Sequence, residues 1–249
     1  MDFFQIHFPT PALHKAELRL RYRIGIELQH LRQRGVYADP MDFSQDLGRF
    51  LQFFEDFQGI YESWQREALR QMEPICCAKG CGNCCQHYPV SVEPFESLAL
   101  YYQLRQRDDF ACILEECFRR VRAFQNIQEN GELTLENEDQ ADAALQSYFV
   151  QGLRCPFLDK HNGCSVHQWR PVTCRMYFSL TPGEFCTPEH LLTPSNRSFH
   201  LCLPDVIEED IAEIGEFWAN LEIPEGLYAA MLSLNYWEGM GVFKPNGLT

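Results

Sequence analysis

The chain has 249 residues, of which 45% are hydrophobic and 13% aromatic, and its formal net charge at pH 7 is −14. This composition excludes a disordered chain, whose signature is few aromatic residues and low hydrophobicity, and the length suffices for one sizeable core. The negative charge disfavours binding to nucleic-acid phosphates and to anionic membranes, because both are bound through clustered Lys and Arg.

Residues 1–75 are expected to be helical. Leu20, Ile24, Leu28 and Leu31 share one helical face. A second series steps by three and four without a break and consists of Leu47, Phe50, Phe54, Phe57, Tyr61, Trp64 and Ala68. Such a stripe is typical of a helix that packs on a core. Gly35 and Pro40 mark the join between the two helices.

The stretch 74–89 is expected to be a loop rich in Cys and Gly. Ser91 as a capping residue and Pro94 in the first turn predict a helix that continues to about residue 106. The next helix presents an inner face of Phe110, Ile113, Leu114, Cys117, Phe118, Val121 and Phe124. Residues 126–142 are polar and acidic, and we expect an exposed turn there, before a helix that ends near residue 150.

From residue 152 to residue 204 the chain is interrupted by prolines and reads as irregular, with room for short strand pairs. Long irregular stretches in compact domains are usually functional. Two helices are expected to close the chain. The first carries Val206, Ile207, Ile211, Ile214, Phe217, Trp218 and Leu221, and the second carries Leu227, Ala230, Met231, Leu234 and Trp237.

These elements predict a mostly α fold in which helical bundle elements surround an irregular, cysteine-rich metal-binding centre. We divide the chain into an N-terminal helical region (1–73), a cysteine-cluster domain (74–203) and C-terminal helices (204–249) that pack on the same core. No run of 18 apolar residues predicts a transmembrane helix. Residues 1–5 lack the features of a signal peptide, so a cytoplasmic location is expected.

Twelve cysteines need an explanation in that setting. Disulfide frameworks belong to secreted domains, whereas clustered cysteines in a cytosolic chain of this size indicate metal binding or catalysis. Cys81 and Cys84 form a Cys-x-x-Cys turn, which lets two thiolates converge on one ion at Zn–S distances near ~2.3 Å. Gly80 and Gly82 flank Cys81 and permit positive φ and close backbone approach. A second block contains Cys155, Cys164 and Cys174.

The adjacent pair Cys84 and Cys85 indicates two metal positions or a multinuclear cluster, because neighbouring side chains diverge; alternatively, one of the two is a small buried hydrophobe. Lys79, Arg154 and Arg175 either offset the charge of a thiolate cluster or are ordinary surface residues. Cys112 and Cys117 are expected to be core thiols. The roles of Cys76, Cys202 and His167 stay open, with His167 either a ligand or a residue that orients its loop.

At these residues the chain resembles the CxxCxxCC, or YkgJ-like, cysteine-cluster family, whose members are described as zinc- or iron-chelating domains. The resemblance covers about residues 74–190 and rests on residues 79–85, 90–96, 155–158, 163–166 and 170–175. It departs from the name motif in that three residues, not two, separate Cys77 from Cys81. The resemblance implies eight metal ligands, which are Cys77, Cys81, Cys84, Cys85, Cys155, Cys164, Cys174 and Cys186. Eight thiolates suit two four-coordinate sites, or a cluster plus a mononuclear site.

The cofactor implied is zinc or iron, an iron–sulfur cluster included, and the partner is the metal ion, with neither nucleic acid nor membrane expected. Flagellin lysine-N-methylases carry a similar signature, so an enzyme is an alternative, although no G-x-G nucleotide loop follows a strand here. A further alternative is an interaction protein that uses the helices in 1–75 and 205–240. We expect the two cysteine blocks to converge as reduced thiols, and the metal to hold residues 152–190 together.

Overall fold

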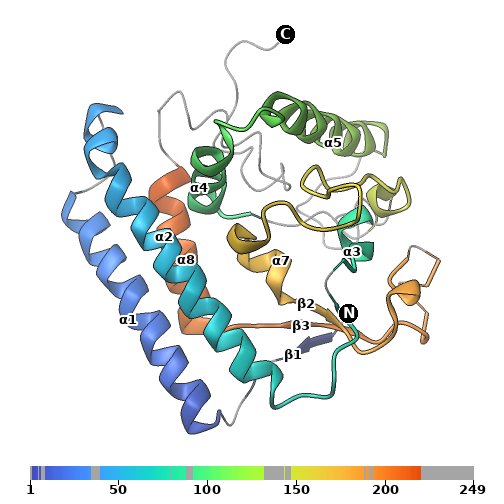
Figure 1. The fold of residues 1–249 in the computed structure, drawn as a ribbon, viewed down its shortest axis with the longest axis horizontal. Coiled ribbons are helices and arrows are strands. Elements are labelled where there is room, and N and C mark those ends of the chain that lie inside the picture. The colour runs from blue at the N-terminus through green and yellow to red at the C-terminus, as the bar shows by residue number, and fades with distance from the viewer. Residues whose placement is uncertain are drawn as a thin grey trace.

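A computed structural model describes residues 2–4, 6, 9–34, 40–78, 80–87, 92–131, 143, 147–187, 189–190 and 193–219. The protein is mostly helical, as predicted. The long helices α1 (Pro11–Arg34) and α2 (Pro40–Leu69) lie on one side, and α3 (Asn83–His87) and α5 (Phe110–Gly131) on the other, with α4 (Pro94–Leu104) and α7 (Val172–Met176) between them (Figure 1).

The apolar stripes predicted for α1 and α2 form the main core. Leu20, Ile24, Leu28 and Leu31 are buried on α1, and on α2 every residue of the predicted stripe from Phe50 to Ala68 is buried, with Leu47 packed at its edge. The join between the helices was also predicted correctly, because α1 ends at Arg34 and α2 begins with Pro40. Proline fits a first helical position, where its missing N–H costs no hydrogen bond.

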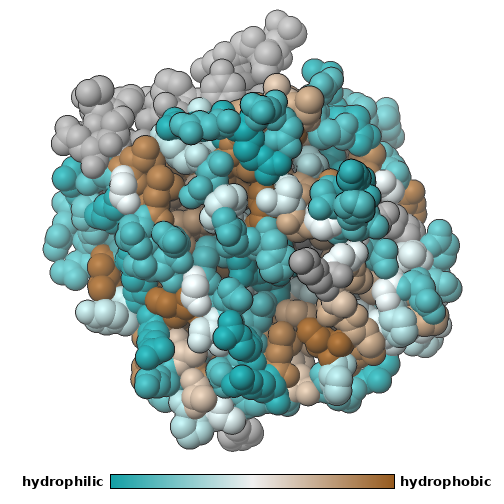
Figure 2. Space-filling model, viewed as in Figure 1, coloured by the Kyte–Doolittle hydropathy of each residue, from teal (hydrophilic) through white to brown (hydrophobic). Residues whose placement is uncertain are grey.

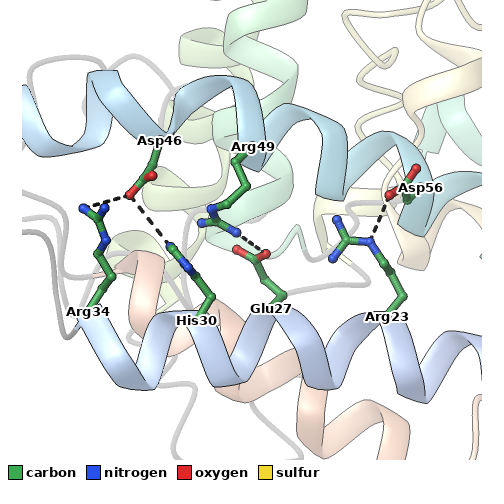
Figure 3. Close-up of polar contacts among 7 residues, drawn as sticks. All are labelled: Arg23, Glu27, His30, Arg34, Asp46, Arg49 and Asp56. Carbon is green, nitrogen blue, oxygen red and sulfur yellow. Dashed lines mark hydrogen bonds and ion pairs between the residues drawn. The ribbon is translucent and has the colours of Figure 1, made fainter.

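Four ionic contacts set the register between α1 and α2 (Figure 3). Arg23 pairs with Asp56 at 3.0 Å, and the fully buried Glu27 pairs with Arg49 at 2.5 Å. Asp46 forms ionic contacts with Arg34 at 3.2 Å and with His30 at 3.8 Å. The sign of the charge on α1 alternates along this row, so sliding one helix by a turn would oppose like charges. The row therefore specifies one antiparallel register, a use best attested for buried charges such as that of Glu27.

Helices α4 and α8 (Asp205–Ala219) complete the core. Phe95 of α4 meets the rings of Phe53, Phe54 and Phe57 at centroid distances of 6.0–6.4 Å. Pro94 opens α4 as predicted, but the N-cap is Glu93, and Ser91 lies outside the described residues. On α8 the predicted inner residue Val206 is 39% exposed, because the helix has only just begun there and its buried face starts at Ile207.

The sheet has three short strands in the order β1 (Asp2–Phe4), β3 (Ser198–Leu201) and β2 (Tyr177–Ser179). β3 pairs antiparallel with β2, which fits the strand pairs allowed within 152–204, and parallel with β1. The expectation that residues 1–75 are entirely helical is therefore wrong at β1. A strand of three residues is too short to show an alternating pattern.

Two further expectations are corrected in the centre of the molecule. The loop predicted for 74–89 contains the short helix α3, and the turn predicted from residue 126 begins later, because α5 continues to Gly131. Packing explains the longer helix, since Phe124 and the partly buried Ile127 lie against Tyr148. The short helices η1 (His167–Trp169), α7 and η2 (Gly183–Phe185) interrupt the irregular segment.

The main core draws residues from all three predicted regions, among them Leu20, Phe95 and Ile211, and the division into domains stays a prediction. The closing helix expected over 227–237 lies outside the described residues. Hydrophilic residues cover most of the face shown in Figure 2. In the part of the chain that the structure describes, none of the helices combines the length and hydropathy needed to cross a membrane.

Candidate metal centre

A tight hairpin brings the second cysteine block against the first. The Cys155 N–H donates to the Cys85 carbonyl at 2.7 Å, and Leu158 pairs with Cys164 across the hairpin. Asp159 shapes the turn, because its Oδ1 accepts from the N–H groups of His161 and Gly163 at 2.7 and 2.8 Å. This Asx-type turn is a known use of a short carboxylate side chain.

The two glycines beside Cys81 act as predicted. Gly80 has φ +84°, a conformation that side chains rarely adopt. A Cβ on Gly82 would lie 3.1 Å from the Asn162 carbonyl and 3.3 Å from Leu158 Cδ2, so this glycine permits the hairpin to approach the first block closely. The cysteine turn and the hairpin are therefore packed against each other.

Four thiols gather where these segments meet the short helix α7. They are Cys85, Cys155, Cys164 and Cys174, which we call the arginine set. Every member is close enough to every other that the negative charge of one raises the pKa of another. Burial is the largest cause for three of them: it raises the pKa of Cys155 and of Cys164 to about 11, and it raises the pKa of Cys174 well above its ordinary value. Such thiols lose their protons when a metal cation binds to the sulfurs in place of the protons.

Two arginines oppose this rise, and they give the set its name. A hydrogen bond and the charge of Arg120 lower the pKa of Cys155, and Arg170 lowers the pKa values of Cys164 and Cys174. Both arginines act on Cys85, whose pKa is raised first by its contact with Cys84 and then by burial. Arg120 reaches this point from α5, where it is 2% exposed.

The basic residues named from the sequence lie elsewhere. Arg154 is exposed and bonds Asn162 Oδ1 at 3.0 Å. Arg175 is buried but donates to the carbonyls of Arg170 and Gln168, both at 3.0 Å, so it shapes the loop before α7. Lys79 lies outside the described residues. Arg120 gave no signal in the sequence, because nothing in a helical pattern shows which distant loop a polar residue will meet.

A second group of thiols lies beside strand β2. It comprises Cys76, Cys77, Cys81 and Cys186, and we call it the strand set. The pKa of Cys77 is raised by burial and then by the charges of the other three, and that of Cys186 is raised by burial, Cys81 and Cys76. Ser179 binds this group from the strand: its N–H donates to Cys77 Sγ at 3.3 Å, and its carbonyl accepts from the Cys76 N–H at 2.8 Å.

The turn after β2 completes the strand set. Asn83 Nδ2 donates to the Gly183 carbonyl at 2.7 Å, and a Cβ on Gly183 would lie 3.1 Å from Cys81 Sγ. Cys81 therefore lies with Cys77 and Cys186 and not with the second block, where we expected it. The sequence left the role of Cys76 open. Cys76 belongs to the strand set because its N–H bonds the carbonyl of Ser179 in strand β2.

Cys84 lies beside Cys85 of the arginine set. Its Sγ is 3.9 Å from Cys85 Sγ, so these neighbouring side chains do not diverge. Two sulfurs on one tetrahedral ion with ~2.3 Å bonds are ~3.8 Å apart. Burial first, and also the charges of Cys186 and Cys84, raise the pKa of Tyr177 to about 12, so Tyr177 lies near Cys84 and the strand set.

The buried carboxylate of Glu96 holds α7, the helix that carries Cys174 of the arginine set. Glu96 on α4 accepts from the N–H of Val172, the first residue of α7, at 2.9 Å, and from the Glu93 N–H at 3.3 Å. Complete burial raises the pKa of Glu96 to about 8, although both donors favour the ionised form. Gln65 of α2 donates to the Arg175 carbonyl at 2.5 Å at the other end of α7. The helix that carries Cys174 is thus tied to the main core.

The remaining candidates lie apart from the two sets. Cys117 is a core thiol as predicted, 1% exposed, with its pKa raised to about 12 by burial. Cys112 was expected in the core and is exposed, because it lies on the outer side of α5. Cys202 Sγ contacts the His200 carbonyl at 3.8 Å. The His167 side chain is exposed on η1, and its carbonyl accepts from Arg175.

All twelve cysteines are free, which is the form that ligates metals. Among the residues that the structure describes, no group of three or more Cys, His, Asp or Glu has the spacing of a finished metal shell. The donors nevertheless fit zinc or iron, since two groups of four soft sulfur ligands lie on adjoining turns. Ligation by the eight residues named from the sequence stays a prediction.

Comparison with known proteins also points to metal chelation. Residues 76–191 match the family model CxxCxxCC, described as "Putative zinc- or iron-chelating domain". Searches of curated proteins and of solved structures found no match. The matched residues include both thiol sets, Arg120 and Glu96. Residues 76–191, a little under half of the chain, are therefore similar to the CxxCxxCC family model, in agreement with the resemblance drawn from the sequence.

Proposed function

We propose that the chain binds two metal ions or one ion and a small cluster, in two separate thiolate sites. The arginine set would hold one and the strand set the other, with Cys84 as an additional ligand beside Cys85. The observation that carries this proposal is the mutual influence of four thiols on three distant segments, at residues 85, 155–164 and 174. Neutral thiols gain little from lying so close together. Thiolates would repel one another at this distance, but a metal cation bound between them attracts each of them.

The role proposed for the metal is structural. The segments that bear the ligands contain few regular elements, and their burial alone repays little of the ~1–2 kcal/mol per residue lost on ordering. A thiolate shell without an open position fits a structural site better than a catalytic one. The ligands are reduced in this proposal, so a reducing compartment such as the cytoplasm suits it.

The test is the metal content of anaerobically purified protein. Zinc, iron and acid-labile sulfide are measured per chain, and a visible absorption spectrum is recorded. Colourless protein with two zinc ions would identify two tetrahedral thiolate sites, whereas brown protein with equal iron and sulfide would identify a cluster. Protein that retains no stoichiometric metal, and takes up neither zinc nor iron under reducing conditions, would refute the proposal.

Single variants assign the sites. Cys174→Ser and Cys77→Ser are each expected to lower the metal content by one site, and the double variant by both. Cys112→Ser is the matched control, because this thiol is exposed and lies in neither set. Loss of both metals in each single variant would contradict the division into two sites.

A further inference from the structure

Helix α1 carries a row of apolar side chains on the side away from the core. Leu18, Tyr22 and Ile26 are 51%, 74% and 44% exposed, and their spacing of four residues places them next to one another along the helix. In the part of the chain that the structure describes, the other large apolar side chains exposed to this degree are Val150 and Val206, on other segments. We call the three residues on α1 the outer row. Exposed apolar residues that lie together mark interaction sites, whereas single ones need no explanation.

The remaining sides of α1 are used for packing within the protein. Arg23 pairs with Asp56 of α2 at 3.0 Å, and Arg32 pairs with Glu213 of α8 at 2.5 Å. The helix lies at the edge of the molecule, with α2 and α8 on its inner side (Figure 1). The outer row is therefore accessible along its whole length to a partner that runs beside α1.

The charge around the outer row is opposite to that of the whole protein. Helix α1 contains six Lys and Arg residues and two Glu residues, whereas the chain has a formal net charge of −14. Lys15, Arg19 and Arg21 are exposed, and among the residues that the structure describes no carboxylate forms an ion pair with them. Carboxylates of a partner can therefore pair with these three cations without breaking an ion pair inside the protein.

A hollow of about 410 Å³ between α1 and α2 adjoins the outer row. Ala16 of α1 and both Gly59 and Ile60 of α2 line it. Arg19, which precedes Tyr22 by three residues and is thus its neighbour on the helix surface, lines it as well. No atom lies within 4 Å of a Cβ added to Gly59, so the hollow is open at that point. It leaves room for an apolar side chain of a partner.

We propose that the outer row and the adjoining hollow bind an acidic amphipathic helix of a partner protein. Apolar side chains of that helix, spaced by three and four residues, pack on the outer row, and one of them enters the hollow. Its Asp and Glu side chains pair with Lys15, Arg19 and Arg21. The outer row extends over ~12 Å at 1.5 Å per residue, so a partner helix of about three turns covers it. This inference goes beyond the proposed metal sites, because α1 carries none of the cysteines.

The charges around the hollow favour a helix over an anionic membrane as the occupant. Glu55 and Asp56 line the hollow from α2. A membrane surface is broad and flat, so its phosphates would approach these carboxylates as well as the cations of α1. A single helix is about 10 Å wide. It can follow α1 and direct its own carboxylates away from α2.

The probe is a display library of random peptides of about 16 residues, which is enough for four helical turns. The library is selected on the full chain, purified under reducing conditions with the metal that it retains. Enriched peptides are then synthesised with a fluorescent label, and anisotropy titrations measure their affinity. Their sequences should have apolar residues three and four positions apart and an excess of Asp and Glu. Their affinity should fall as the salt concentration rises, because exposed charges are screened.

Variants test whether the peptides bind at this place. Tyr22→Ser should weaken binding by about 10–30-fold, because tyrosines that become buried are typical anchors of interfaces. Arg19→Glu should weaken it by about fivefold or more, since like charges repel. Gly59→Met fills the hollow without changing the charge and should weaken binding by about tenfold. The controls are Val150→Ser, which removes an exposed apolar side chain elsewhere, and Arg119→Glu, which reverses a half-exposed charge on α5. Both should bind the peptides as the original protein does.

A selection without enrichment, or enriched peptides without an acidic excess, would overturn the inference. So would peptides that bind Tyr22→Ser within about twofold of Val150→Ser. If Tyr22→Ser alters the circular dichroism, Gly59→Met decides in the same way. Vesicles of phosphatidylserine and phosphatidylcholine test the membrane, and sedimentation velocity tests a second copy of the chain. Vesicle binding or dimer formation that Tyr22→Ser abolishes would overturn the inference in favour of that occupant. None of these results affects the proposed function, which depends on the metal content.

Discussion

The arginine set and the strand set are both groups of four cysteine thiols, but their surroundings differ. The arginine set is drawn from three distant segments and has two guanidinium groups beside it. The strand set lies on turns around β2, where the Ser179 N–H bonds Cys77 and where Cys76 is exposed. One set therefore has two arginines beside it, whereas the other has a backbone N–H and an exposed member.

Because of this difference, we expect the two proposed metal sites to have different roles. A metal in the arginine set would cross-link α3, the hairpin at 155–164 and α7, so its loss would free several segments at once. A metal in the strand set would join a turn to an edge strand that is already held by backbone hydrogen bonds, such as Cys76 N–H to the Ser179 carbonyl. The first site should govern stability, and the second should exchange its metal more readily.

The largest expected effect comes from removing a ligand of the arginine set. Cys174→Ser should destabilise the centre severely, because a structural zinc site can contribute on the order of 10–16 kcal/mol in small domains. Amides in 152–178 should exchange rapidly with solvent, while those of α1 and α2 keep their protection and most helical circular dichroism persists. Hydrogen exchange with mass spectrometry measures this.

Cys81→Ser provides the comparison, since it removes a ligand of the strand set. Its effect should stay near β2 and the turn at 183–186, and the hairpin at 155–164 should remain protected. If complete metal removal leaves the exchange of residues 152–190 unchanged, the thiols do not hold the centre together and the assignment of a structural role is wrong.

The next effect concerns Glu96, which ties α7 and thus Cys174 to α4. Its pKa is raised to about 8 by burial, so the folded state holds a proton that the unfolded chain releases near pH ~4.3. Its contribution is therefore complete at low pH and is lost as the pH rises from about 4 through 8. This linkage amounts to on the order of 5 kcal/mol for a buried group.

Glu96→Gln should remove that dependence. At pH 5.5 the variant should be less stable by about 1–3 kcal/mol, because an amide has one acceptor for two backbone donors. At pH 8.5 the difference should shrink or reverse. Urea unfolding of both proteins at each pH measures it, and the difference cancels effects common to both. A constant difference across the range would show that Glu96 is ionised throughout.

Local pattern accounts for what the sequence predicted well. The stripes of α1 and α2 depend on neighbours three and four residues away, and the turn at Cys81 needed the glycines that flank it. The resemblance to a cysteine-cluster family brought Cys155 and Cys174 into one centre with Cys85, and the structure places these thiols together.

Contacts between distant segments account for what was missed. Arg120 meets Cys155 across 35 positions of sequence, and Glu96 meets Val172 across 76, so neither has a spacing that could reveal it. Cys76 and Cys77 could not be told apart by spacing, and the pairing of residue 76 with β2 now places both in the strand set. Strand β1 was missed for a related reason, because its partner β3 lies at the other end of the chain.

A smaller effect tests the order of metal release. With a chelator in excess, metal should leave in two phases, the strand set first, because Cys76 is exposed and admits the competing ligand. A difference of about tenfold in rate corresponds to ~1.4 kcal/mol in barrier. Stopped-flow absorbance with a coloured chelator resolves the phases, and Cys77→Ser should abolish the faster one. If the faster phase is lost in Cys174→Ser instead, the arginine set releases its metal first and the expected order is wrong.

The smallest expected effect comes from Gly183 in the strand set. A Cβ there would lie 2.6 Å from Asn83 Nδ2 and 3.1 Å from Cys81 Sγ, so Asn83 must move and its bond to the Gly183 carbonyl is weakened. Gly183→Ala should therefore lower metal affinity at the strand set by a factor of about five to ten, the equivalent of one hydrogen bond of ~1 kcal/mol. The arginine set should be unaffected. Gly59→Ala on α2 is the matched control, because nothing lies within 4 Å of its added Cβ and alanine favours a helix. Equal metal affinities of the strand set in the two variants would show that the turn at residue 183 accommodates the added Cβ without displacing Cys81.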